Sequence, residues 1–224
     1  TQLNTGIEGF TAVDLNGRQG RRHRRSIRVF LGFRPATGAD IQRLSDSLVS
    51  NVLPFDPQAR HGRDIALDWF LAQRLEPPAN DQLERAIRST VHEYEIGLQE
   101  TIYSRLSAAS KAVIDRMLAG DDSDAVDDST NTIDTAATFA QLKADLGKSS
   151  RDNLLLGIER RQAIDVIGLV AEVFKGVPVK FIDQFRQRCA TESIRELRRH
   201  PAPIRYSMVA MFCWRRQQQL TDSL

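Results

Sequence analysis

Cysteine is scarce in this sequence: its 224 residues include two, Cys189 and Cys213, which is too few for a disulfide framework. No group of cysteine and histidine residues has the spacing of a zinc site. A signal peptide is also lacking, and no apolar run approaches the roughly 18 residues that a membrane-spanning helix needs. These absences exclude the disulfide-rich secreted and membrane-spanning classes. We therefore expect a cytoplasmic protein with no membrane partner and no cofactor.

Lysine is rare as well. Of the 31 basic residues 26 are arginine and 5 are lysine, and 29 acidic residues reduce the net charge to +2. Arginine contacts phosphates and guanine edges through its planar fork of donors, whereas lysine acts as a point charge. The content of 41% hydrophobic and 27% charged residues is typical of a globular protein. Because the net charge is small, the positions at which arginines cluster in the sequence say more about function than their total number.

The densest cluster lies between Gly17 and Arg34, a stretch with seven arginines and no acidic residue. Residues 21–31 have the pattern of a helix, and Gly32 predicts its end. On a wheel of about 100° per residue, one face of this helix carries Arg21, Arg24, Arg25 and Arg28. Like charges spaced along one helix face repel each other, so an unrelieved positive face favours a nucleic-acid ligand over a merely solvated surface.

The opposite face of this predicted helix carries Ile27 and Phe30, with His23 between them and Leu31 at the border. We expect this apolar face to dock on a core, with His23 pointing inward and the arginines pointing outward. Among those arginines Arg24 and Arg28 are central, so they are expected to contribute most to binding. Arg74 and Arg116 are expected to contribute less.

Two groups of motifs resemble landmarks of the Tn-three-family transposases. The first is Gly17-Arg18, His23-Arg24, Ile27-Arg28 and Leu31-Gly32-Phe33-Arg34. The second is Arg199-His200-Pro201, followed by Ile204-Arg205-Tyr206 and by Phe212 with Trp214. Their order and approximate separation are similar to those of the family, and the resemblance covers nearly the whole chain, from about Asp14 to Leu224.

The resemblance implies the N-terminal region of a bacterial transposase, which recognises double-stranded DNA at the terminal inverted repeats of its transposon. In that family an Asp-Asp-Glu metal site cuts the DNA, and it lies on a separate ribonuclease-H-like domain, C-terminal to this region. We therefore expect an internal, nucleoid-associated fragment of a longer protein that binds DNA without cutting it. A divalent metal is expected only in the absent catalytic domain.

Hydrophobic periodicity predicts an all-α fold with little or no sheet, built from two lobes of short helices. Residues 1–20 are predicted to be the tail of a preceding segment, and residues 21–119 the first lobe. In this lobe Thr37 and Asp40 resemble a capping box, and helical patterns follow near residues 41–52, 65–70, 80–102 and 107–118. Short helices joined by tight turns suit a helix-turn-helix-like unit, and equally any small helical bundle.

An acidic stretch at residues 120–138 separates the two predicted lobes. It contains six aspartates and no basic residue. Hard cations take oxygen ligands, but the glycine and the glutamate that an EF-hand loop requires are missing from their positions. A flexible acidic linker is the favoured interpretation, and we expect proteases to cut there first.

The second lobe is predicted at residues 139–224, with its C-terminal helix truncated. A helix that starts near Phe181 is expected to run toward Pro201 and to present a second basic surface. Residues 204–214 are apolar on most sides, which is typical of a buried helix. The predicted DNA-binding residues of both lobes are Arg18, Arg21, Arg22, Arg24, Arg25, Arg28, Arg34, Arg186, Arg188, Arg195, Arg198, Arg199 and Arg205.

Two alternatives compete with DNA binding by these arginines. Arg199, His200, Arg205 and Tyr206 resemble the active-site residues of tyrosine recombinases, but they lie within eight positions, whereas those enzymes gather them from distant segments. Tyr206 is therefore predicted to be a core residue and His200 to end a helix, and no catalytic or metal-binding residue is predicted. The other alternative is a helical dimerisation module, which would need an exposed apolar face.

Overall fold

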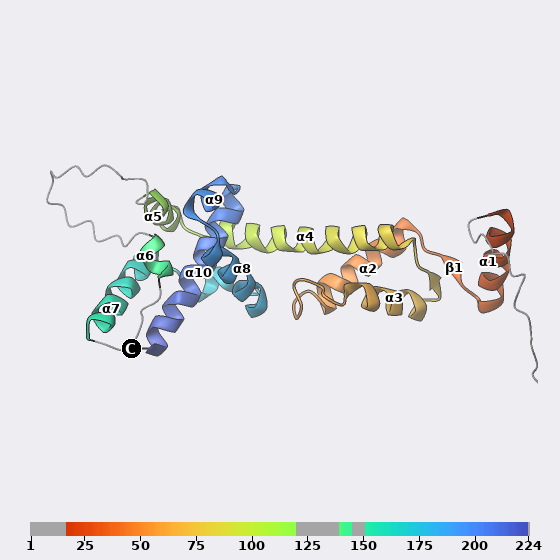
Figure 1. Cartoon of the computed structure of the whole chain (residues 1–224), viewed down its shortest axis with the longest axis horizontal. Helices are drawn as coiled ribbons and strands as arrows, with labels where there is room; N and C mark the ends of the chain where they lie inside the picture. Colours follow the sequence, from red (N-terminus) through yellow and green to blue (C-terminus); the bar gives the residue numbers. More distant parts are fainter. Residues whose placement is uncertain (1–16, 120–138, 145–150, 224) are drawn as a thin grey trace, which may run out of the picture. The chain divides into compact units, whose positions relative to one another are not determined.

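The part of the chain that the structure describes, residues 17–119, 139–144 and 151–223, folds almost entirely into helices (Figure 1). Within those ranges this computed structural model contains ten α-helices, one 3₁₀ helix and two strands of two residues each. The predicted all-α fold class is thus confirmed. The acidic stretch 120–138 lies outside the described residues, so its flexibility and its sensitivity to proteases stay predictions.

Most of the elements along the chain are helices. In that order the elements are α1 (Arg18–Leu31), β1 (Arg34–Pro35), α2 (Gly38–Asn51), α3 (Gly62–Ala72), β2 (Leu75–Glu76), α4 (Asn80–Arg105), α5 (Ala108–Ala119), α6 (Phe139–Lys143), α7 (Arg151–Asp165), η1 (Ala171–Phe174), α8 (Val179–Thr191), α9 (Ile194–Arg199) and α10 (Ala202–Ser223). Strands β1 and β2 are parallel, and they pair Arg34 with Leu75 and Pro35 with Glu76.

Two compact units make up the described chain, and the chain passes between them within α2, in the loop before α3 and within α4. The first unit contains residues 17–48 and 59–89, and the second contains residues 49–58, 90–119, 139–144 and 151–223. The sequence predicts a boundary at the acidic stretch and assigns residues 21–119 to one lobe. The structure instead groups α5 and the second half of α4 with the C-terminal helices, because their apolar side chains share one core.

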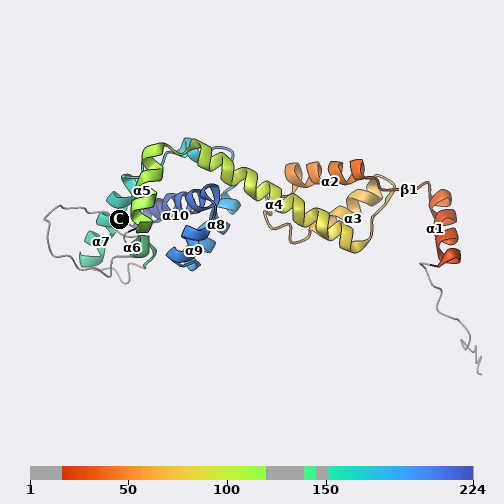
Figure 2. The same ribbon diagram turned by 90° about the horizontal axis from the view of Figure 1, so that it is seen from above.

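The core of the first unit lies between α2, α3 and the beginning of α4, which are side by side in both views (Figures 1 and 2). Leu44 of α2, Phe70 of α3 and Leu83 of α4 are each at most 1% exposed. Gly62 begins α3 close to α4, since a Cβ built on it would lie 3.1 Å from Cγ2 of Ile87. Each helix thus buries one apolar side, as its spacing predicts.

The start of α2 is held by Asp40, which is 1% exposed. Its carboxylate accepts hydrogen bonds from the backbone N–H of Thr37 (2.8 Å) and from the Thr37 hydroxyl (2.7 Å). The predicted capping box is therefore half present. The acid caps the N–H of Thr37 as in a capping box, but the hydroxyl donates to that acid, and the N–H of Asp40 donates to the Thr37 carbonyl (3.0 Å).

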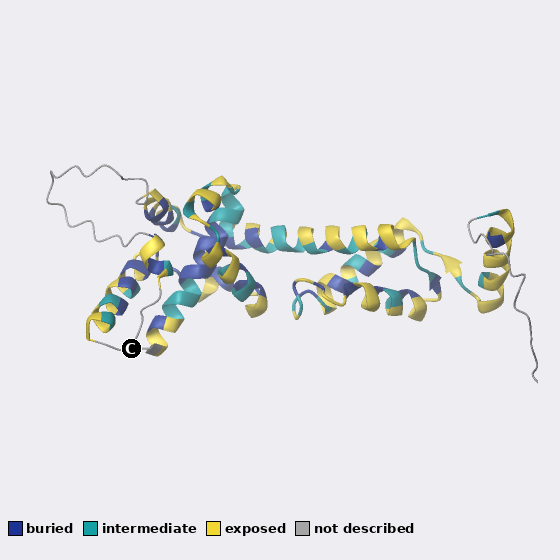
Figure 3. Cartoon of the chain, in the orientation of Figure 1, coloured by how far each residue is buried: buried dark blue, intermediate teal, exposed yellow. Residues whose placement is uncertain are grey.

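A larger core fills the second unit, where α8 packs along α10. The rings of Phe181 and Phe185 lie 4.5 Å apart between centroids, and Phe139 of α6 meets Phe212 of α10 at 5.2 Å. Residues 206–213 of α10 are each at most 8% exposed, so this part of α10 is buried on all sides (Figure 3). The predicted buried helix near residues 204–214 is confirmed.

The helix predicted to run from Phe181 toward Pro201 is two helices, α8 and α9. The break is at Glu192, whose backbone is extended (φ −71°, ψ 140°), and Ser193 starts the next helix with a complete capping box. The Ser193 hydroxyl accepts from the N–H of Glu196, and the Glu196 carboxylate accepts from the N–H of Ser193 (2.7 Å). The Ser-x-x-Glu signal was in the sequence, and the continuous apolar spacing obscured it.

Candidate nucleic-acid interface

The arginine-rich segment forms α1, and its end is the one that the sequence predicts. Gly32 adopts the left-handed conformation (φ 70°), and the N–H of Phe33 donates to the carbonyl of Arg28 (2.8 Å). Glycine suits this position because a side chain would be strained there. The helix starts at Arg18, three residues before the predicted start, so residues 18–20 belong to it and not to a preceding tail.

One side of α1 faces a groove of about 620 Å³. The groove is lined by Gly20, His23, Arg24, Ile27, Arg28, Leu31, Phe33, Glu76 and Pro77. Two arginines of this side, Arg24 and Arg28, both form ion pairs with Glu76 of β2, and the Arg28 Nη1 to Glu76 Oε2 distance is 2.7 Å. The sequence predicts that these two arginines lie at the centre of a free face. In the structure they instead hold α1 against β2.

The Glu76 carboxylate is well suited to that role. Its side chain is 16% exposed, against 62% for Arg24 and 27% for Arg28. Burial by itself raises the pKa of Glu76, but hydrogen bonds and charge from Arg28 and Arg24 outweigh burial and bring the pKa below its usual value. Glu76 therefore stays ionised in the neutral range, and its one negative charge offsets half of the charge of Arg24 and Arg28.

Within the described residues, no core covers the apolar side of α1. Ile27 is 57% exposed, Leu31 53% and Phe30 89%, and Gly20 is the only buried residue in this helix. His23 is exposed and lines the groove, so the prediction that it points inward is wrong. Figure 3 shows the whole helix largely in the colour of exposed residues. The wheel reveals an apolar face, but it cannot reveal whether another element covers that face.

The opposite, outer side of α1 carries a stripe that the sequence interpretation missed. Arg18, Arg22, Arg25 and Val29 follow one another at spacings of four, three and four residues, and all four are exposed. No acidic side chain within residues 17–119, 139–144 and 151–223 forms an ion pair with these three arginines. Arg21 is exposed between the two sides. We call Arg18, Arg22, Arg25 and Val29 the outer face.

Arg34, another predicted DNA-binding residue, is anchored within the first unit. Its guanidinium donates two hydrogen bonds to Asp40, at 2.7 and 2.8 Å, and Arg43 pairs with the same carboxylate. Hydrogen bonds from Arg34 and Thr37 hold the pKa of Asp40 far below its usual range, and the same bond raises the pKa of Arg34. Arg34 thus joins β1 to the start of α2, although its side chain remains 53% exposed.

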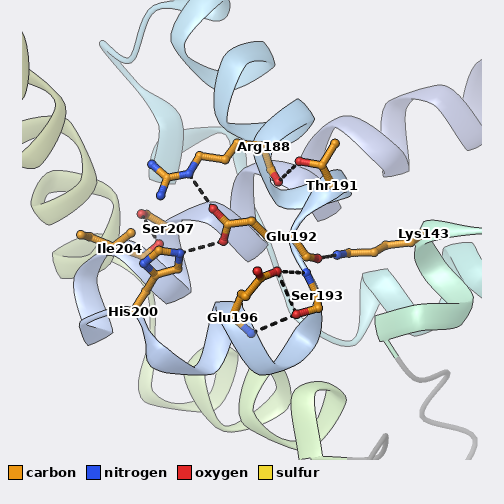
Figure 4. Close-up of polar contacts among 9 residues, drawn as sticks. All are labelled: Lys143, Arg188, Thr191, Glu192, Ser193, Glu196, His200, Ile204 and Ser207. Carbon is orange, nitrogen blue, oxygen red and sulfur yellow. Dashed lines mark hydrogen bonds and ion pairs between the residues drawn. The ribbon is translucent and has the colours of Figure 1, made fainter.

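The second predicted basic surface is smaller than the sequence suggests. In Figure 4 Arg188 points toward Glu192 and donates to its Oε1 (2.7 Å), and Nε2 of His200 lies 2.7 Å from Oε2 of the same carboxylate. Burial raises the pKa of Glu192, but hydrogen bonds from Arg188 and His200 outweigh it and the pKa is lowered. His200 follows α9 directly, as predicted.

Other arginines of this region cap backbone carbonyls. Arg198 is half-buried and donates to the carbonyl of Leu118 at the end of α5. Arg205 donates to the carbonyl of Arg198 (3.2 Å) and lies over the Tyr206 ring at 4.9 Å. Arg186 is half-buried, and Arg195 and Arg199 are exposed on α9. The exposed cations are therefore fewer here than on α1.

Tyr206 is a core residue, as predicted. It is 8% exposed, its hydroxyl donates to Oδ2 of Asp115 (2.7 Å), and its ring stacks on Tyr103 with centroids 5.7 Å apart. Burial and the bond to Asp115 both raise the pKa of Tyr206. A raised pKa disfavours the phenolate that a recombinase nucleophile would need.

Changing Tyr206 to Phe should therefore affect stability and not chemistry. Losing one hydrogen bond to an exposed carboxylate should lower the free energy of unfolding by about 0.5–1.5 kcal/mol. Incubation of the unmodified chain with labelled DNA and Mg²⁺ or Mn²⁺ should yield no specific nick. Specific nicking by the unmodified chain that disappears in the Tyr206→Phe variant would restore the recombinase interpretation.

The thiols and the acidic side chains of the described ranges form no further site. Cys189 and Cys213 are buried free thiols, and burial raises the pKa of both, to about 12 for Cys189. No three His, Cys, Asp or Glu residues of the described chain are grouped so that they could hold a metal ion. None of its helices combines the length and the apolar character needed to cross a membrane. 

The chain was compared with protein-family models and with curated protein sequences. No model of a protein family matches the chain, and no curated protein sequence matches it. The resemblance carried by the sequence motifs therefore stays a hypothesis.

Proposed function

We propose that this chain binds double-stranded DNA and recognises the terminal inverted repeats of a transposon, as a non-cutting part of a transposase. The observation that carries DNA binding is the outer face of α1. Three exposed arginines at helical spacing, with no acidic partner in the described chain, form a surface that a polyanion would neutralise. The choice of transposon ends rests on the motifs that resemble the Tn-three family.

The two sides of α1 have separate tasks in this proposal. Glu76 pairs with Arg24 and Arg28 and fixes one side of the helix to β2. The outer face is then free to enter the major groove, which is wide enough for an α-helix. Arg195 and Arg199 of α9 supply a second, smaller contact, and catalysis belongs to a domain outside this chain.

The test is binding to a duplex of the inverted repeats that flank the coding gene, measured by fluorescence anisotropy against a shuffled duplex. Each neutralised phosphate contributes a slope of about −0.9 to log K against log salt concentration. If roughly six arginines contact phosphates, affinity should fall by about three decades between 50 and 200 mM salt. Equal affinity for the shuffled duplex would refute recognition of the repeats. A salt-independent affinity would refute binding through arginines.

A second candidate function, self-association, is favoured by α7. Leu154, Leu155 and Ile158 are 45%, 52% and 42% exposed, and their spacing places them on one side of that helix. Arg151 and Asp165 stand at equal distances along the sequence from Ile158. An antiparallel pairing of two copies about Ile158 would therefore bring opposite charges together at both ends of the contact.

Sedimentation velocity over a range of concentrations decides this point. If α7 forms a dimer, replacing Leu155 and Ile158 by Glu should raise the dimer dissociation constant by at least about tenfold, since it removes the central apolar contacts. Val170→Glu is the matched control, because Val170 is an equally exposed valine (57%) outside α7. A wild-type chain that stays monomeric at every concentration would remove this candidate.

A further inference from the structure

Val29 is an apolar side chain at the end of the otherwise basic outer face of α1. It is 75% exposed. Val29 follows Arg25 by four residues, so it lies on the same side of α1 as Arg18, Arg22 and Arg25. It is not among the residues that line the groove on the other side of α1. Packing within the first unit therefore does not account for Val29.

The length and the chemistry of the outer face fit the edge of a few base pairs. Val29 lies eleven positions after Arg18. At about 1.5 Å per residue, the stripe is therefore about 16 Å long. That length spans about five base pairs of a duplex that rises about 3.4 Å per pair. An apolar side chain gains nothing from a phosphate, and the apolar group that the major groove presents is the C5 methyl of thymine.

We infer that Val29 reads base sequence by contacting the C5 methyl group of a thymine in the major groove, beside phosphates or bases held by Arg18, Arg22 and Arg25. This inference rests on the proposed binding of DNA through the outer face. It adds a requirement for an A·T pair at one position of the bound site, next to the positions that arginines contact. The arginines supply most of the affinity, and Val29 supplies discrimination at that pair.

The experiment removes the methyl group from the DNA one thymine at a time. The probe is a duplex that the full chain selects from a randomised pool, and each thymine in turn is replaced by deoxyuridine, which pairs identically but lacks the methyl. At one position the replacement should lower affinity about fourfold, the value expected from exposing one methyl group. In the Val29→Ala variant the same replacement should have no effect. Val166→Ala, at a valine that is 65% exposed in the second unit, should retain the full fourfold effect.

The possible outcomes distinguish the role of Val29 from the proposed binding of DNA through the outer face. Sequence-preferring, salt-dependent binding with no effect of deoxyuridine at any position would overturn the role of Val29 and leave DNA binding intact. A deoxyuridine effect that persists in Val29→Ala would assign the methyl contact to another residue and equally overturn the inference. Failure of the chain to select any duplex from the pool would overturn both.

Discussion

Replacing Arg18, Arg22 and Arg25 together by Ala should weaken DNA binding about 500-fold at 0.1 M salt. Three phosphate contacts account for this loss, because each contributes about 0.9 to the dependence of log K on log salt concentration. The salt slope of the variant should be flatter by about 2.7. Anisotropy titrations at several salt concentrations give both values. The effect is large because no acidic side chain of the described chain offsets these charges.

The matched comparison is the Arg24→Ala and Arg28→Ala double variant. Glu76 already pairs with both of these arginines, so their removal should flatten the salt slope by less than one contact, about 0.9. The sequence interpretation makes the opposite prediction, since it places both residues at the centre of the exposed face. A double variant that flattens the slope by about two contacts, with the triple variant unchanged, would reject the outer face.

Replacing Arg18, Arg22 and Arg25 by Lys separates charge from geometry. Lysine keeps the positive charge, so the salt slope should stay that of the wild type. It lacks the planar fork, so a bidentate guanine contact should weaken and base preference should relax at that pair. Far-UV circular dichroism should be unchanged in both variants of Arg18, Arg22 and Arg25, because these three side chains are exposed.

Large-to-small changes in the two cores should destabilise the two units separately. Ile114→Ala should cost about 2–5 kcal/mol and Phe70→Ala about 3–5 kcal/mol, since both side chains are fully buried. The chain contains one tryptophan in each unit, Trp69 beside Phe70 and Trp214 stacked on Phe174. Single-tryptophan variants, made by Trp69→Phe or Trp214→Phe, therefore report the denaturation of each unit by fluorescence.

Because α5 belongs to the second unit, a change in its core residue Ile114 should affect only the unfolding transition of that unit. Ile114→Ala should lower the denaturation midpoint reported by Trp214, because Ile114 shares the core of the second unit. It should leave the midpoint reported by Trp69 in place, and Phe70→Ala should do the reverse. Val166→Ala, at an exposed site, should change the free energy of unfolding of neither unit by more than about 0.5 kcal/mol. If Ile114→Ala shifts only the Trp69 transition, the predicted lobe of residues 21–119 is correct and the units drawn here are not.

Local patterns in the sequence determined the helices themselves. The apolar spacing of residues 80–102 predicts α4, Ser107 caps α5 with its hydroxyl accepting from the N–H of Ser110 (2.9 Å), and Gly32 ends α1. Helix formation and termination depend on residues within one or two turns of each other, and a sequence contains that information directly. The same holds for Tyr206, whose apolar neighbours predict a buried position.

Tertiary structure alone decided which surfaces of these helices are free. The wheel of α1 gives the angular positions of its arginines, but it cannot show that Glu76, 48 residues after Arg28, pairs with two arginines on one side of the helix. It cannot show either that the apolar side faces an open groove, or that residues after Ser89 pack with the C-terminal helices. Charge pairing and burial depend on residues brought together from distant parts of the chain. For that reason the outer face, with Val29 at its end, emerges only from the fold.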